Sequence, residues 1–238
     1  MIDELHLPPL EDFDAQKNFS VKLSNLRGRL DASFHLPIVE KIILHIKNYA
    51  AEVTTIGDNR ISSAVILPGR FKRVYVDEGH GITFFGGRSI GELNPSDKKY
   101  LSFAMHDEKI KNELTIHEKM ILVTCSGTIG KVALVPKHWD GWAMTHDIIR
   151  LIPRSELEGY VYIWLQTDYA NKIITSFTYG AVIPHIEKFH LESVPIPILK
   201  NVDAQKKINA LALLANEKRF AAYELEQTAL KILEEEIF

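Results

Sequence analysis

The sequence contains a single cysteine among its 238 residues, and this scarcity excludes several kinds of protein. One thiol cannot form an internal disulfide, which is typical of proteins that fold in a reducing cytoplasm. The ten histidines never form an HxxxH or HExxH pair, so they and the lone cysteine provide no zinc-ligand set. We therefore expect a cytoplasmic protein without a metal site.

Long hydrophobic stretches are also lacking. Unbroken apolar runs such as residues 120–123 are far shorter than the roughly 18 residues that cross a bilayer. The first five residues include Asp3 and Glu4, the reverse of the basic start of a signal peptide. Hydrophobic residues make up 46% of the chain and charged residues 25%, as in an average globular protein. These values predict a folded protein with no membrane contact.

The chain as a whole has no excess of positive charge, since its formal net charge is -3. The charge is uneven, however: residues 1–20 carry -4, whereas residues 60–99 carry +3. The basic residues of that segment are Arg60, Arg70, Lys72, Arg73, Arg88, Lys98 and Lys99. They form either a local basic patch for an anionic partner or an ordinary solvated face.

The pattern of short strands and few helices predicts an α+β fold rather than a doubly wound sheet. Glycine and proline break residues 52–152 into short strands at 52–56, 71–76, 81–85, 120–125, 131–135 and 147–152. We expect helices at 38–50 and 159–178 and a last strand at 194–198. The division we predict is an N-terminal arm (1–33), a β-rich domain (34–200) and a long helix (201–238).

The last segment differs from the rest because residues 203–238 contain neither glycine nor proline. Asp203 is a suitable N-cap for one continuous helix of about 50 Å. The segment also keeps a heptad pattern. The positions predicted to face a partner helix are Ile208, Leu211, Ala215, Ala222, Leu225, Ala229 and Ile232. Either this helix packs on its own domain, or it pairs with a helix from another chain, and its length favours the second interpretation.

No catalytic constellation is evident. The string 127–131 (GTIGK) has the glycines and lysine of a phosphate loop, but its spacing is too short and Val132 replaces the metal-binding hydroxyl. Cys125 ends an apolar strand and is more simply a buried structural residue than an activated thiol. The sequence therefore favours a binding protein over an enzyme.

Several strings resemble the specificity subunits of type I restriction-modification systems. They occur in the expected order over residues 27–238, and the string around residues 121–132 is the most diagnostic. The strings are RLDASFH (29–35), GGRSI (86–90), ILVTCSGTIGKV (121–132), HDIIRL (146–151), YGAVIPHI (179–186), VPIP (194–197) and QKKI (205–208).

This resemblance implies a DNA-recognition subunit without catalysis of its own. Such a subunit directs a methyltransferase partner, which binds S-adenosylmethionine and modifies adenine at N6, and also recruits a motor-nuclease subunit. A typical member has two recognition domains and two long helices, whereas this chain has one of each. We therefore expect a half subunit that reads one half of a bipartite site and pairs as a homodimer through its C-terminal helix. Two alternatives are the specificity portion of a fused or split restriction-methyltransferase and, in another class, an oligomeric interaction module that does not bind DNA.

Recognition of double-stranded DNA requires basic side chains for phosphates and polar ones for base edges. We expect base reading chiefly from the idiosyncratic loops at residues 58–73 and 94–106, and scaffold roles for the shared strings. To the seven basic residues above, the prediction of DNA contact adds Ser89, Ser126, Thr128, Lys131, Tyr179 and His185.

Overall fold

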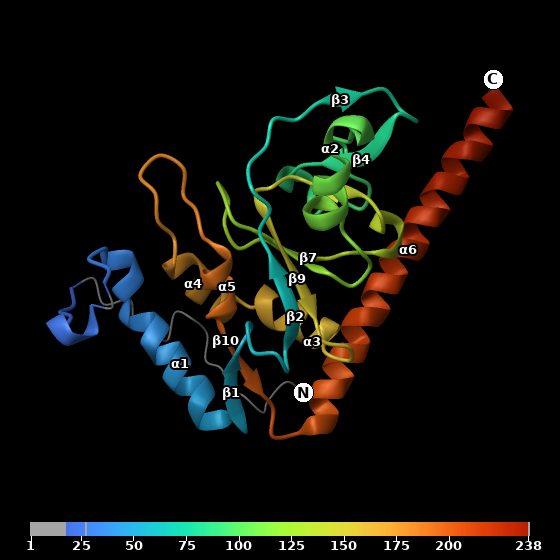
Figure 1. The fold of residues 1–238 in the computed structure, drawn as a ribbon. Coiled ribbons are helices and arrows are strands. Elements are labelled where there is room, and N and C mark those ends of the chain that lie inside the picture. Colours follow the sequence, from blue (N-terminus) through green and yellow to red (C-terminus); the bar gives the residue numbers. More distant parts are fainter. Residues whose placement is uncertain (1–17, 27, 238) are drawn as a thin grey trace.

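The computed structural model describes residues 18–26 and 28–237, and it shows a β-rich body flanked by one long helix (Figure 1). The predicted arm at 1–33 lies partly outside the described residues. Within the described part, Arg29 docks on the end of α4 (Asp168–Ser176), because its guanidinium donates to the carbonyl oxygens of Phe177 and Thr178, both at 2.8 Å. The same side chain holds Asp31 in an ion pair of 2.7 Å.

The first four-stranded sheet forms the centre of the body, in the order β2-β9-β6-β7 with every neighbouring pair antiparallel. Its strands are β2 (Ser62–Ile66), β6 (Ile121–Thr124), β7 (Val132–Leu134) and β9 (Ile148–Pro153). Strand β6 is buried along its whole length, which explains its continuous run of apolar residues. The largest hydrophobic cluster packs this sheet against α1 (Pro37–Tyr49), α3 (Glu158–Gln166) and α4.

The second four-stranded sheet has the order β3-β5-β4-β8 and mixes antiparallel pairs with the parallel pair β4–β8. Its strands are β3 (Tyr75–Val76), β4 (Gly81–Phe85), β5 (Lys99–Ser102) and β8 (Ala143–Met144). The helix α2 (Phe103–Lys109) and a π-helical turn, Ile110–Leu114, cover this part of the body. A third sheet has two strands, β1 (Glu52–Thr55) and β10 (Pro195–Ile198). The helix α5 (Lys188–Glu192) directly precedes β10 in the chain.

The α+β prediction is confirmed, and so are the predicted strands that became β1, β4, β6, β7, β9 and β10. Four local predictions were wrong. Asp203 is not the N-cap of the last helix, because it lies inside the first turn and Asn201 Oδ1 accepts the bond from Ala204 N at 2.9 Å. Of residues 71–76 only the last two join a sheet, and the expected helix at 159–178 breaks at Thr167, whose side chain caps α4. The segments 58–73 and 94–106, which we interpreted as loops, contain β2, β5 and the start of α2.

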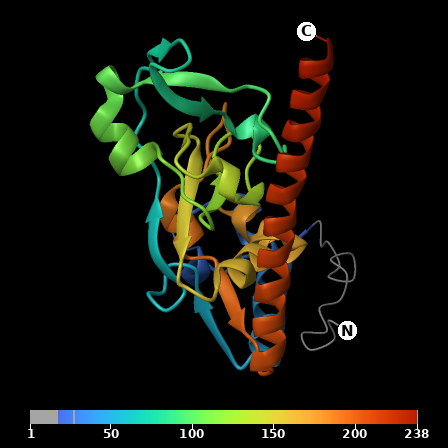
Figure 2. The same cartoon turned by 90° about the vertical axis from the view of Figure 1, so that its right-hand side faces the viewer.

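The long helix is α6 (Val202–Ile237), and it runs along one side of the body in both views (Figures 1 and 2). Its N-terminal half packs on α3, where Tyr160 donates its backbone N–H to Asn209 Oδ1 at 3.0 Å. Further along, Asn216 donates to the carbonyl oxygen of Val135 at 3.1 Å. The His138 ring then stacks on Tyr223 with a centroid distance of 4.2 Å. Beyond Tyr223 nearly every residue of α6 is exposed, so the helix both packs on its own domain and projects past it.

None of the helices in the described part of the chain is long and apolar enough to span a membrane.

Candidate nucleic-acid interface

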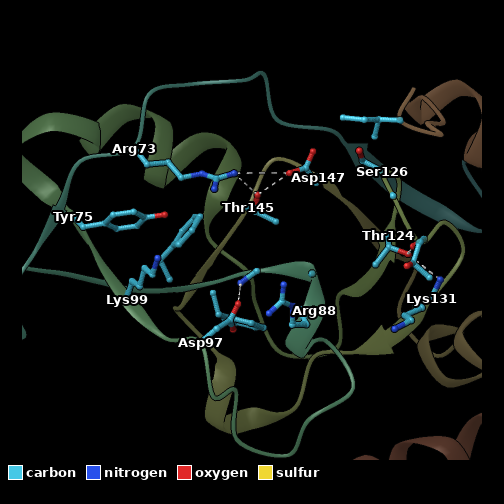
Figure 3. Close-up of a pocket in the computed structure, with 17 residues that line it drawn as sticks. Arg73, Tyr75, Arg88, Asp97, Lys99, Thr124, Ser126, Lys131, Thr145 and Asp147 are labelled. Carbon is cyan, nitrogen blue, oxygen red and sulfur yellow. Dashed lines mark hydrogen bonds and ion pairs between the residues drawn. The ribbon is translucent and has the colours of Figure 1, made fainter. Parts of the chain in front are cut away.

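A pocket of about 700 Å³ opens on the face where residues of both four-stranded sheets meet (Figure 3). One wall comes from the β3-β5-β4 part of the second sheet, and the opposite wall from the β6–β7 turn. Four basic side chains line it, against two carboxylates. The basic residues are Arg73, Arg88, Lys99 and Lys131, and the acidic residues are Asp97 and Asp147. The lining therefore carries two net positive charges.

Arg73 is the most firmly held of these cations. Its Nη2 donates to Thr145 Oγ1 at 2.8 Å and lies 3.8 Å from Asp147 Oδ2, while its guanidinium sits 5.6 Å from the centre of the Phe84 ring. Figure 3 shows the Arg73 side chain extended toward Thr145 and Asp147. A guanidinium oriented in this way retains N–H groups for a bidentate contact with guanine O6 and N7.

The turn that holds Arg73 is itself fixed by a buried arginine. Arg150 is 0% exposed, and it donates to the carbonyl oxygens of Met144 at 2.7 Å, Thr145 at 3.1 Å and Ile148 at 2.6 Å. Burial lowers the pKa of Arg150 to about 9. Because this value is still above 7, the guanidinium remains protonated at neutral pH. Carbonyl groups, rather than a carboxylate, therefore stabilise this buried charge and the β8–β9 turn.

The β6–β7 turn forms the opposite wall and carries Ser126, Thr128 and Lys131. Its two glycines, Gly127 and Gly130, have φ values of 72° and 83°, a left-handed conformation that other residues adopt at a cost. Lys131 donates its backbone N–H to Thr124 Oγ1 at 2.9 Å, which closes the turn. The string GTIGK is thus a tight turn of a sheet, and its lysine side chain reaches the pocket (Figure 3).

The pocket brings together six of the thirteen residues for which the sequence predicts DNA contact. These are Arg73, Arg88, Lys99, Ser126, Thr128 and Lys131. Arg70 and Lys72 are exposed but do not line it. The basic segment 60–99 is therefore only partly gathered at this site.

The remaining predicted residues have other surroundings. Arg60 is engaged by Glu52 at 2.6 Å and Asp58 at 2.8 Å, so its charge is already paired. Ser89 is 0% exposed and donates to Glu92, which makes it a scaffold residue rather than a surface contact. Lys98 donates to Asn94 Oδ1 at 2.7 Å.

Tyr179 and His185 stand at the base of a hairpin beside the pocket. The hydroxyl of Tyr179 donates to Glu187 Oε1 at 2.8 Å, and His185 Nε2 lies 3.1 Å from the same oxygen. Burial and the neighbouring carboxylate raise the pKa of Tyr179 to about 12. Through Glu187 the two rings therefore support the hairpin, and neither of them lines the pocket.

Sequence reasoning missed both carboxylates of the pocket, because a search for phosphate contacts selects basic residues. Asp97 Oδ2 accepts a hydrogen bond from Gly86 N at 3.3 Å, and Asp147 sits on the turn below Arg73. Carboxylates repel phosphates but accept hydrogen bonds from the amino group of cytosine. The mixture of charges is thus suited to base edges as well as to the backbone of a nucleic acid.

The pocket offers no sign of a catalytic or metal centre. In the part of the chain that the structure describes, no cluster of histidine, cysteine and acidic residues is arranged to hold a metal ion. Cys125 is buried beneath the pocket, and burial raises the pKa of its thiol to about 12, so no thiolate forms at neutral pH. The interpretation of Cys125 as a structural residue is confirmed.

The predicted dimerisation positions lie mostly on the face of α6 that turns away from the body. With about 100° of rotation per residue, Leu225 and Ile232 point nearly opposite to the buried residues Asn209, Ala212 and Asn216, while Leu211 and Ala222 point to one side of that direction. Leu211, Leu225 and Ile232 are 56%, 72% and 56% exposed. Ile208 is the exception, because it packs against the core of its own domain.

Comparisons with known proteins identify the domain. Residues 105–211 match the family described as "Type I restriction modification DNA specificity domain". This part of the chain is therefore similar to a type I restriction-modification DNA specificity domain. The match includes most of α2, the β6–β7 turn, the β8–β9 turn, the 179–185 hairpin and the start of α6. It supports the expectation of a recognition domain rather than an enzyme.

Solved structures share the fold of this specificity domain. A chain of a type I R-M system, solved for its complex assembly and conformational transition, has a TM-score of 0.51 at 16% identity, over 84% of this chain and 50% of that one. The S subunit from M. genitalium has a TM-score of 0.50 at 17% identity, over 77% and 44%. The HsdS subunit from Thermoanaerobacter tengcongensis has a TM-score of 0.50 at 16% identity, over 83% and 50%.

The chain spans about half the length of these solved proteins. No curated protein sequence matches it significantly.

Proposed function

We propose that the chain is a DNA-recognition subunit of a restriction-modification system, reads one half of a bipartite site, and directs an adenine-N6 methyltransferase partner. The observation that carries this proposal is the pocket, where four basic side chains and two carboxylates converge. Two of these six residues, Lys131 and Asp147, belong to the segment that matches the specificity-domain family. Methyl transfer, with its S-adenosylmethionine, belongs to that partner, and cleavage to a motor-nuclease subunit. Such a complex acts in the cytoplasm.

Two copies of the chain would complete a bipartite reader. The exposed apolar face of α6 supports a homodimer in which the helix of one protomer packs on that of its partner, so that two recognition domains face two half-sites. On this proposal residues 34–200 form the recognition domain and residues 201–238 the spacer helix. The target is then an interrupted palindrome.

The experiment that tests the function is coexpression with the neighbouring methyltransferase gene, followed by sequencing of the DNA for modified adenines. A gapped palindromic motif is the expected result. Modified adenines in a motif without a gap would contradict the bipartite arrangement, and the absence of any sequence-dependent modification would contradict the recognition role.

Two matched variants test the pocket as the DNA-binding face. Lys99→Ala removes an exposed cation that lines the pocket, whereas Arg60→Ala removes one already paired with Glu52 and Asp58. We expect Lys99→Ala to weaken binding of the motif by the complex at low salt and to reduce the slope of log K against log salt by about 0.9. Arg60→Ala should leave the slope unchanged. Equal effects of both variants would locate DNA elsewhere on the surface.

The dimer is tested by charge on the exposed face of α6. Ala222→Glu together with Leu225→Glu places two carboxylates on the proposed seam. Thr228→Glu adds a charge on the flank of the same helix. Light scattering should show monomers for the double variant and dimers for the control and the wild type. A dimer that survives the double variant would exclude this face as its interface.

A further inference from the structure

The hairpin at residues 179–185 carries exposed apolar side chains at its tip. It lies between α4 and α5 and rises beside the central sheet, in orange in Figure 1. Val182 is 92% exposed and Ile183 is 58% exposed. Single exposed apolar residues are common in folded proteins, but two neighbours at the end of a projecting hairpin are a candidate contact surface.

This tip has a fixed position rather than a free loop's range of conformations. The backbones of Tyr179 and His185 pair through two hydrogen bonds of 3.0 and 2.8 Å. The Pro184 carbonyl oxygen accepts a third, of 3.0 Å, from Gly127 N in the β6–β7 turn. The hairpin is thereby tied to the same turn that carries Lys131. Because the tip is already ordered, a contact made by its side chains loses little conformational entropy on binding.

The position of the tip indicates what covers it. Ile183 lines the pocket together with Lys131 and Arg73, so any molecule drawn to those cations comes against the apolar tip. A polyanion with an apolar interior satisfies both features, and duplex DNA has charged phosphates outside and stacked bases inside. Proteins that bend DNA insert aliphatic side chains of this kind between base pairs and unstack one step.

We propose that Val182 and Ile183 form an apolar wedge that enters the duplex held at the pocket and partly unstacks one base step. This inference rests on the proposed function. Specificity would then depend partly on how easily the contacted step deforms, since pyrimidine–purine steps unstack at lower cost than others.

The test uses the complex with its methyltransferase and duplexes that carry the motif found by sequencing. In these duplexes 2-aminopurine, whose fluorescence rises on unstacking, replaces each adenine in turn. The variant is Val182→Ser combined with Ile183→Ser. The matched control is Leu44→Ser, which removes a 60% exposed apolar side chain from α1, outside the pocket. Equal urea midpoints of unfolding will show that all three proteins fold alike.

We expect a rise in fluorescence at one step with the wild type and the control. The double variant should show no rise and bind about tenfold more weakly, since it loses the burial of two apolar side chains. Its salt dependence should be unchanged, because no charge is altered.

Wild-type binding without unstacking at any step, together with unchanged affinity in the double variant, would overturn the wedge and leave the proposed function intact. A double variant that binds the methyltransferase less well but still unstacks DNA would also overturn it, and would assign the tip to a protein contact. Failure of the wild-type complex to prefer any duplex would instead overturn the proposed function, and the wedge with it.

Discussion

The crossing of α3 and α6 depends on a residue without a side chain, and this provides a sharp test of the packing. A Cβ atom added to Gly159 would lie 2.3 Å from the carbonyl oxygen of Asn209 and 2.9 Å from the Cβ of Ala212. The Asn209 oxygen is a backbone atom and the Ala212 Cβ is a methyl group, so neither can move away by rotation of a side chain. We therefore expect Gly159→Ala to force the two helices apart.

The size of the effect follows from these distances. Contacts of a Cβ atom closer than 3.0 Å are essentially never found, so the helices must separate by about 1 Å. Overpacking of this kind costs typically 1–3 kcal/mol, and weakening the adjacent bond from Tyr160 N to Asn209 Oδ1 costs about 1 kcal/mol more. The higher helix propensity of alanine returns up to about 1 kcal/mol. With the full propensity gain, the free energy of unfolding should fall by about 1–3 kcal/mol.

Urea unfolding measures this change directly. With a denaturant slope of about 3 kcal/mol/M, the midpoint should fall by roughly 0.3–1 M. Gly91→Ala is the matched control, because its added Cβ meets no atom within 4 Å, and it should stay within about 0.5 kcal/mol of the wild type. A Gly159→Ala protein as stable as the wild type would show that propensity outweighs the clash and that α6 is not held by this crossing.

Three further predictions concern single side chains. Arg150→Met leaves carbonyl oxygens in the β8–β9 turn without a donor and should cost about 3–5 kcal/mol in urea unfolding; a cost below 1 kcal/mol would contradict the bonding described. Burial lowers the pKa of His138, so below pH 6.5 the unfolded chain binds a proton that the folded chain does not. The free energy of unfolding therefore decreases as the pH is lowered. His138→Phe keeps a ring against Tyr223 and should lose less stability between pH 7.5 and 5.5 than the wild type; an equal loss would exclude His138 as its source. Arg73→Lys keeps the charge but loses the planar fork, so sequencing of modified adenines should show one relaxed position in the motif, and an unchanged motif would exclude base reading by Arg73.

The strands that the sequence predicted are those with strong local signals. Strand β6 is a run of apolar residues bounded by turns, and β9 is similar, so both were found. The strand β8 has two residues and exists because it pairs in parallel with β4. A contact of that kind depends on the tertiary arrangement and leaves no local pattern. The break between α3 and α4 did have a signal, because Thr167 followed by Asp168 is a typical helix start.

Only part of the site could be predicted, because local sequence patterns do not show contacts between distant residues. Basic residues of the segment 60–99 are visible in the sequence, but their partners are not. Arg60 is neutralised by Glu52 across the β1–β2 connection, and only the fold brings these two together. Asp97 and Asp147 reach one pocket from distant parts of the chain, and nothing in the spacing of either residue indicates it.

The two walls of the pocket have different origins in the sequence, and this bears on how such a domain acquires a new target. The strings that resemble the family supply the β6–β7 turn and the 179–185 hairpin, whose geometry is fixed by backbone hydrogen bonds to Gly127 and Thr124. On the facing side, Arg88 belongs to the string at 86–90, whereas Arg73 and Lys99 belong to none of those strings. Side chains on that wall are held by side-chain contacts, such as those of Arg73 with Thr145 and Asp147, rather than by the backbone hydrogen bonds of the turn. Substitutions there can alter the groups presented to base edges without disturbing the turn that forms the other wall, so we expect target specificity to change first at Arg73, Asp97 and Lys99.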